Sequence, residues 1–153
     1  MEKDIDQIQQ ELQEMVLEDI RKIYSEKTID HAMNPRNVGE MPAADGYGGA
    51  LGSCGDSMEI WLKVKDDVVR DARFWTDGCS STIACGSVIT EMAKGKPLAE
   101  AQRIGQQDVL KSLDGLPEEN EHCAALAANA IKEAIKDYLK MKREPWKKAY
   151  RRR

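Results

Sequence analysis

The segment Ser57-Met58-Glu59-Ile60-Trp61-Leu62-Lys63-Val64-Lys65 alternates between apolar and polar side chains. One face carries four apolar side chains, those of Met58, Ile60, Leu62 and Val64, as is typical of a half-buried β-strand. Asp66-Asp67 forms a turn, and residues 68–76 return as a second strand with Ala72 and Phe74 facing inward. We therefore expect a β-hairpin at the centre of the fold, with a weaker third strand over residues 47–53.

Helical patterns dominate the chain after the hairpin. The expected helices cover residues 81–94, 98–104, 106–113 and 121–142. Ser80 or Ser81 is a suitable N-cap for the first of them, and Gly95 marks its end. Because strands come first and helices follow, we predict an α+β fold: a small three-stranded antiparallel sheet with helices packed on one face, plus an extended N-terminal helix.

An amphipathic helix is predicted over residues 3–24, because apolar side chains recur there at intervals of three and four. We expect this helix to pack on the domain or on another subunit. Packing on another subunit would make the protein a homo-oligomer. A docking helix for a different partner is the alternative. The chain then divides into an N-terminal amphipathic extension (1–23), one domain (24–142) and a basic, solvated C-terminal tail (143–153).

The bulk composition limits the function classes. The chain has 153 residues, of which 33% are charged, and its net charge is −4. One domain fits this length, and the negative charge argues against nucleic acid as a partner. No apolar run is long enough to cross a membrane, and the N-terminus has no signal-peptide core. We therefore expect a cytoplasmic protein without a membrane partner, whose four cysteines stay reduced.

Three of the cysteines lie where predicted elements begin or end. Cys54 precedes the strongest strand, Cys79 lies between the second strand and a helix, and Cys123 lies at the start of the last helix. For Cys79 and Cys123 the helix dipole favours the thiolate, so we expect a lowered pKa for both. Cys85 lies inside a helix among apolar residues and is interpreted as a core residue.

Two further side chains are candidate ligands. His122 is adjacent to Cys123, and Asp56 follows Cys54 within the same loop. Neighbouring residues on a regular helix point about 100° apart, so we expect His122 and Cys123 to alternate as ligands of one site. The spacing is not that of a zinc module with paired CxxC motifs. On their own, the residues therefore predict a thiolate metal site without identifying the metal.

An ordered set of motifs resembles the IscU/NifU-type family of iron–sulfur cluster assembly scaffolds. The motifs are Tyr24-Ser25-Glu26-Lys27-Thr28-Ile29-Asp30-His31, Asn34-Pro35-Arg36-Asn37-Val38-Gly39, Cys54-Gly55-Asp56, Asp71-Ala72-Arg73-Phe74, Gly78-Cys79 and His122-Cys123. They occur in the family's order and span residues 24–142. The resemblance implies an α+β fold with a small antiparallel sheet and a cluster site at one end.

The resemblance also implies roles for the candidate residues. Cys54, Cys79 and Cys123 would ligate iron, with Asp56 and His122 as alternative or fourth ligands. A cysteine desulfurase would deliver persulfide sulfur, with Cys123 as the favoured acceptor, and zinc could occupy the site instead. The expected product is a [2Fe–2S] cluster, which apo-proteins would then receive. An iron donor or a ferredoxin would be a further partner. The protein would be a scaffold and not an enzyme.

Three features depart from the family pattern. The family's chaperone-binding motif, Leu-Pro-Pro-Val-Lys, is replaced by Leu116-Pro117-Glu118-Glu119-Asn120, which argues against recruitment of a dedicated Hsp70. The N-terminal helix is longer than usual, and Cys85 takes a place often held by serine.

Two other functions use the same residues. In a zinc-dependent sulfurtransferase, zinc would occupy the site and a thiol would accept sulfur from the desulfurase. In a zinc-stabilised adaptor, the metal would serve only the fold. A scaffold differs from both because it must release its product. The carboxylate of Asp56 is a hard ligand among soft thiolates and should keep a cluster exchangeable.

Overall fold

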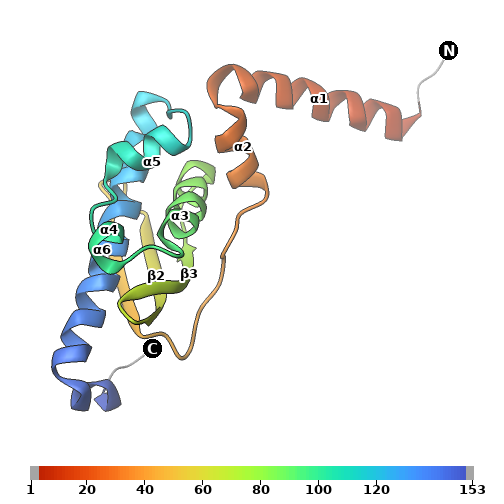
Figure 1. The fold of residues 1–153 in the computed structure, drawn as a ribbon. Helices are drawn as coiled ribbons and strands as arrows, with labels where there is room; N and C mark the ends of the chain where they lie inside the picture. Colours follow the sequence, from red (N-terminus) through yellow and green to blue (C-terminus); the bar gives the residue numbers. More distant parts are fainter. Residues whose placement is uncertain (1–3, 151–153) are drawn as a thin grey trace.

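The computed structural model describes residues 4–150, and Figure 1 shows its fold. The elements follow in the order α1 (Ile5–Ile23), α2 (Glu26–Met33), β1 (Gly46–Leu51), β2 (Ser57–Lys65), β3 (Val68–Thr76), α3 (Ser80–Ala93), α4 (Leu98–Ala101), α5 (Gln106–Ser112), η1 (Glu118–Asn120), α6 (Glu121–Arg143) and η2 (Pro145–Tyr150). Residues 1–3 of the predicted N-terminal extension and 151–153 of the predicted tail lie outside the described residues.

The sheet is an antiparallel meander in the order β1-β2-β3. Asp66 and Asp67 both have positive φ, 55° and 58°, and join β2 to β3 as the predicted two-residue turn. Ile60 stands between Gly48 on β1 and Phe74 on β3 in the strand register. The three-stranded sheet and the central hairpin predicted from the alternating pattern are therefore confirmed.

Helices α3 and α6 cover one face of this sheet (Figure 1). The side chains of Met58, Ile60 and Leu62, which share a face of β2, are fully buried beneath them. Cys85 is also fully buried, as expected for a core residue. An α+β fold with helices packed on one face of the sheet is thus confirmed.

Small residues let both helices approach the strands closely. A Cβ atom on Gly48 would lie 2.3 Å from the backbone nitrogen of Ala134 in α6. A Cβ atom on Gly86 of α3 would lie 2.4 Å from the ring of Phe74 in β3. Both distances are below van der Waals contact, so glycine is required at each position. These two contacts fix the helices against the sheet and thereby place the segments that carry the cysteines.

The structure differs from the sequence-based prediction in two local details. The N-cap of α3 is Cys79, not Ser80 or Ser81. Helix α2 was not predicted. Ser25 caps it through Thr28 N–H, and both hydroxyls contact the carbonyl oxygen of Leu113. Such a short helix gives little periodic signal and depends on this tertiary contact.

Helix α1 leaves the rest of the molecule at an elbow near Tyr24 and extends away from the sheet (Figure 1). We expected this helix to pack on the domain or on another subunit. None of its residues is buried, and its own domain covers it only in part, at Ile20. Among the residues that the structure describes, no helix combines the length and the hydropathy needed to cross a bilayer.

Candidate metal centre

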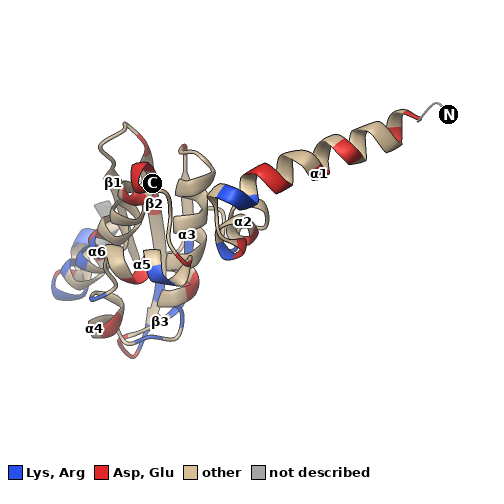
Figure 2. Ribbon diagram, turned by 90° about the horizontal axis from the view of Figure 1, so that it is seen from above, with Lys and Arg blue, Asp and Glu red and all other residues tan. Residues whose placement is uncertain are grey.

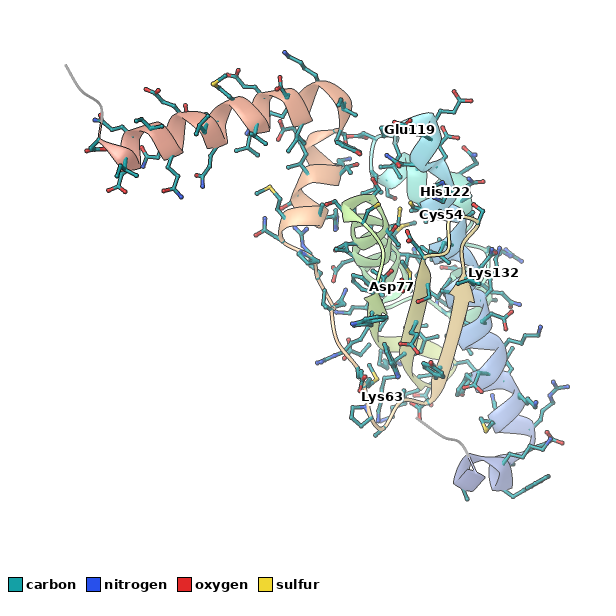
Figure 3. The ribbon with its side chains drawn as sticks, turned by 180° about the vertical axis from the view of Figure 1, so that it is seen from behind. Cys54, Lys63, Asp77, Glu119, His122 and Lys132 are labelled. Carbon is teal, nitrogen blue, oxygen red and sulfur yellow. The ribbon has the colours of Figure 1, made fainter. Side chains whose placement is uncertain are left out.

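Three separate segments meet at the end of the sheet where β2 begins and β3 ends. The loop before β2 carries Cys54 and Asp56, the loop between β3 and α3 carries Cys79, and the first turn of α6 carries His122 and Cys123. Figure 3 shows Cys54 and His122 side by side at this end of the molecule. Residues separated by up to 69 positions in the sequence are therefore brought to one place by the fold.

The imidazole of His122 links two of the cysteines. Its Nε2 atom lies 3.2 Å from Sγ of Cys54 and 3.7 Å from Sγ of Cys123. We expected His122 and Cys123 to point apart, but both side chains reach the same site. The ring of His122 is long enough to extend from its own helical position past Cys123 to the opposing loop. Alternation between the two as ligands is therefore not required by geometry.

The hydroxyl of Thr82, which was not among the predicted site residues, links the remaining candidates. Its Oγ1 atom lies 3.1 Å from Oδ2 of Asp56, 3.3 Å from Sγ of Cys123 and 3.7 Å from Sγ of Cys79. Thr82 is fully buried in the first turn of α3. Its position three residues after Cys79, on the same helical face, was the available signal. All five predicted residues are thus connected through Thr82 and His122.

Thr82 cannot serve all three neighbours as a donor, because a hydroxyl has one proton and two lone pairs. Its one proton can go to the carboxylate of Asp56 or to the sulfur of Cys123 at any moment, whereas between Thr82 and Cys79 either group can be the donor. When a thiol becomes a thiolate, it can only accept, and it then competes with Asp56 for the single proton. The hydroxyl thus couples the position of the carboxylate to the protonation of the sulfur atoms.

The two cysteines at helix starts differ in pKa. Burial raises the pKa of Cys79, but hydrogen bonds from the backbone and hydroxyl of Thr82 and from the backbone of Ser81 bring it below its usual value. Burial raises the pKa of Cys123 and outweighs the hydrogen bond from Thr82, while the nearby Cys79, Cys54 and Asp56 raise it further. The expected lowering is therefore confirmed for Cys79 and wrong for Cys123.

Asp77 holds two cysteine-bearing loops together. Its Oδ1 atom accepts hydrogen bonds from the backbone N–H of Ser57 at 2.8 Å and from its hydroxyl at 3.2 Å. Ser57 follows the loop of Cys54 and Asp56, whereas Asp77 precedes Cys79 by two residues. The carboxylate therefore fixes the separation between the two loops. Because these hydrogen bonds favour its charged form, the pKa of Asp77 lies below its usual value.

The donor set is suited to a soft or borderline metal. Thiolates and imidazole favour iron–sulfur clusters and zinc, whereas the single carboxylate is a harder ligand. Cys54 and Cys79 are exposed, Asp56 and His122 are partly exposed, and Cys123 is 1% exposed. Within residues 4–150, no three His, Cys, Asp or Glu side chains form a ready-made site for a single metal ion.

The fold and this donor set define a small α+β domain with a thiolate-rich site at one end of its sheet. The family model of the NifU-like N-terminal domain matches residues 23–145. Iron–sulfur cluster assembly scaffold protein IscU 1 of Archaeoglobus fulgidus is 48% identical over 120 residues, covering 77% of this chain and 78% of the relative. The scaffold protein IscU of Escherichia coli (strain K12) is 50% identical over 126 residues, covering 79% of this chain and 97% of the relative.

A solved structure shows the same fold. The crystal structure of a nitrogen-fixing NifU-like protein (N-terminal) from Brucella abortus matches with a TM-score of 0.63 and 22% sequence identity. The match covers 79% of this chain and 97% of that one. The chain therefore belongs to the NifU-like N-terminal domain family, and the resemblance predicted from the sequence motifs is confirmed.

Proposed function

We propose that this protein is a scaffold on which an iron–sulfur cluster is assembled and from which it is transferred to apo-proteins. The observation that carries the proposal is the meeting of Cys54, Cys79 and Cys123 at one end of the sheet, linked by His122 and Thr82. Relatives named as cluster assembly scaffolds, about half identical to this chain, support the same role and do not favour the zinc-dependent sulfurtransferase. The role is that of a scaffold and not of an enzyme.

We assign iron binding to Cys54, Asp56, Cys79, His122 and Cys123. A site with only soft thiolates holds its metal firmly, and structural zinc sites bind with about 10–16 kcal/mol. A carboxylate in the set weakens that hold, because it is a hard ligand. Asp56 is already within hydrogen-bond distance of the buried hydroxyl of Thr82. It can therefore leave a cluster for a stable alternative position, which suits a cargo that must be released.

Sulfur delivery by a cysteine desulfurase fits the thiols. An acceptor thiolate would attack the outer sulfur of the desulfurase persulfide, forming a new S–S bond and releasing the desulfurase thiolate. Two electrons from a reductant such as a ferredoxin would then convert the bound outer sulfur to sulfide. We keep Cys123 as the acceptor implied by the family resemblance. Because Cys123 is 1% exposed, transfer requires that the loop of Cys54 or the side chain of His122 move aside.

The cargo, the iron source, the chaperone requirement and the location follow from the same interpretation. A [2Fe–2S] cluster is the proposed cargo, iron comes from an iron donor, and zinc can occupy the same ligands. The segment Leu116-Pro117-Glu118-Glu119-Asn120 contains η1 and presents acidic residues where the family motif has Pro and Val. We therefore propose that transfer proceeds without a dedicated Hsp70. A cytoplasmic location agrees with the use of reduced thiols.

Anaerobic reconstitution with a cysteine desulfurase, cysteine and ferrous iron tests the proposal. We expect a visible iron–sulfur absorption band and near-stoichiometric iron and sulfide. Cys54→Ser should abolish the band, whereas Cys85→Ser, at a buried position outside the site, should preserve it. Colourless wild-type protein with tightly bound zinc would instead indicate the sulfurtransferase. Loss of the circular dichroism signal on chelation would indicate a zinc-stabilised adaptor.

A further inference from the structure

Helix α1 exposes an apolar stripe that its own domain covers only in part, at Ile20. Ile5, Val16 and Ile23 are 81%, 56% and 62% exposed, and no residue of the helix is buried. An isolated helix of this length is marginally stable in water, and amphipathic helices gain their stability by burying the apolar face. A continuous exposed apolar face of this kind marks an interaction surface. The helix therefore needs a partner to be stable.

The spacing of apolar residues along the stripe is the same in both directions. The stripe consists of Ile5, Ile8, Leu12, Val16, Ile20 and Ile23. Successive members are separated by three, four, four, four and three residues. If a second α1 lies antiparallel against the first, Ile5 meets Ile23, Ile8 meets Ile20 and Leu12 meets Val16. Each apolar residue of the stripe on one helix then faces an apolar residue on the other, as an isologous two-fold interface requires.

The polar residues on the same face fit this arrangement. Gln9 and Asp19 are the polar positions within the stripe, and the two-fold operation that pairs the apolar levels places Gln9 beside the other copy's Asp19. An amide and a carboxylate can form a hydrogen bond there. A parallel pair would instead place two Asp19 carboxylates at one level, and like charges repel. The antiparallel direction is therefore favoured.

Charge complementarity supports the same direction. Asp4 and Asp6 lie at the start of α1, and Arg21 and Lys22 lie in its last turn. Figure 2 shows the acidic positions along α1 and the basic position next to α2. An antiparallel pair brings acidic starts beside basic ends twice, and it also opposes the two helix dipoles. The charges and the spacing of the apolar residues therefore both favour a second copy of α1 as the partner of the stripe.

The surroundings of α1 leave room for a second α1 helix. Leu12, Val16 and Ile20 line an open groove of about 580 Å³ together with the exposed Met33 of α2. The N-terminal end of α1 points away from the sheet and helices (Figure 1). With a length of about 28 Å, the paired helices would place the two domains at opposite ends of the pair. The region matched by the family begins at residue 23, so this surface belongs to the extension of this chain.

We propose that α1 is a dimerisation helix that pairs antiparallel with α1 of a second copy through the stripe of Ile5, Ile8, Leu12, Val16, Ile20 and Ile23. Each domain keeps its own cysteine site, because none of these six residues belongs to it. The pairing therefore does not depend on the chemistry of the site.

Sedimentation velocity of the full chain at micromolar concentration tests the pairing. We expect twice the chain mass of 17.2 kDa. Leu12→Glu with Val16→Glu places charges at the two-fold axis and should give a monomer with a weaker helical circular dichroism signal. Gln7→Glu with Gln10→Glu adds the same charge on the polar face and should stay dimeric. A monomeric wild-type chain, or a dimer that survives the first pair of substitutions, would overturn the proposal.

A photo-crosslinking residue at position 8 tests the direction. In the antiparallel pair, mass spectrometry should find the cross-link on the peptide that contains Ile20 of the second copy. A cross-link to the region of Ile8 itself would show a parallel pair and refute the antiparallel arrangement. The absence of any adduct between two copies would refute the interface.

Discussion

The Oγ1 atom of Thr82 lies 3.1 Å from Oδ2 of Asp56, among the predicted ligands. The same hydroxyl is within reach of Sγ of Cys79 and Cys123 and is inaccessible to solvent. A buried hydroxyl must be satisfied by the groups around it. Thr82 therefore determines where the carboxylate and two of the thiols lie when the site is free of cargo.

Thr82→Val tests this role. The substitution keeps the shape but removes the proton that Asp56 accepts, and we expect a loss of about 1–2 kcal/mol in the free energy of unfolding, measured by urea titration. Metal binding, measured with Co²⁺ by its visible spectrum, should also weaken. Thr82→Ser should restore both. Thr90→Val, in the same helix but bonded to the carbonyl oxygens of Gly86 and Ser87, should lower stability without changing the Co²⁺ spectrum.

Asp56→Ala should slow the release of a reconstituted cluster. Without the carboxylate, the remaining ligands are softer and hold iron more firmly. The decay of the visible band after addition of a chelator or an apo-ferredoxin measures the rate, and we expect a decrease of several-fold. Glu100→Ala removes an exposed carboxylate on α4 and serves as the control. Equal release rates for wild type and Asp56→Ala would contradict the role of Asp56.

The thiols should differ in their reactivity with iodoacetamide in the metal-free protein. The thiolate is the reactive form, so a lowered pKa moves the onset of alkylation to lower pH and a raised pKa moves it to higher pH. Alkylation of Cys79 should therefore begin at a pH below the usual thiol pKa of about 8.5, and alkylation of Cys123 at a pH above it. Cys85, which is buried and has a raised pKa, should react last. Peptide mass spectrometry across a pH series measures the order.

Thr82→Val should also change the pH at which the cysteines are alkylated. It removes a hydrogen bond that lowers the pKa of both Cys79 and Cys123. Alkylation of both residues should then begin at higher pH than in the wild type. A Cys123 that reacts before Cys79 in the wild-type protein would contradict the assignment.

Gly48→Ala should destabilise the protein by about 2–3 kcal/mol, because the new methyl group would meet the backbone of α6 at 2.3 Å. Displacement of α6 would also move His122 and Cys123, so Co²⁺ binding should weaken. The neighbouring Gly49→Ala is the matched control. Its Cβ atom meets Met58 O at 3.4 Å and should cost less than about 1 kcal/mol. Similar unfolding midpoints for the two variants would be inconsistent with the close approach of α6.

Much of the fold could be predicted from the sequence, because local patterns carry it. The alternation from Met58 to Val64 predicts a strand with one buried face, and Asp66-Asp67 supports a two-residue turn. The periodicity of residues 121–142 predicts α6, which the structure places at Glu121–Arg143. Helix α2 could not be predicted in this way, because its buried contact through Thr28 is with Leu113, far along the chain.

The sequence by itself determined which residues are candidate metal ligands, because thiols, imidazole and carboxylate are recognised by their chemistry and by the order of their motifs. Only the tertiary structure decided that these groups meet, that Thr82 stands among them, and that Cys79 and Cys123 differ in pKa. The physical reason is that burial and hydrogen bonding depend on contacts between distant segments, which no local pattern specifies. For α1 the sequence determined the amphipathic stripe, and the structure decided that its own domain leaves most of the stripe uncovered.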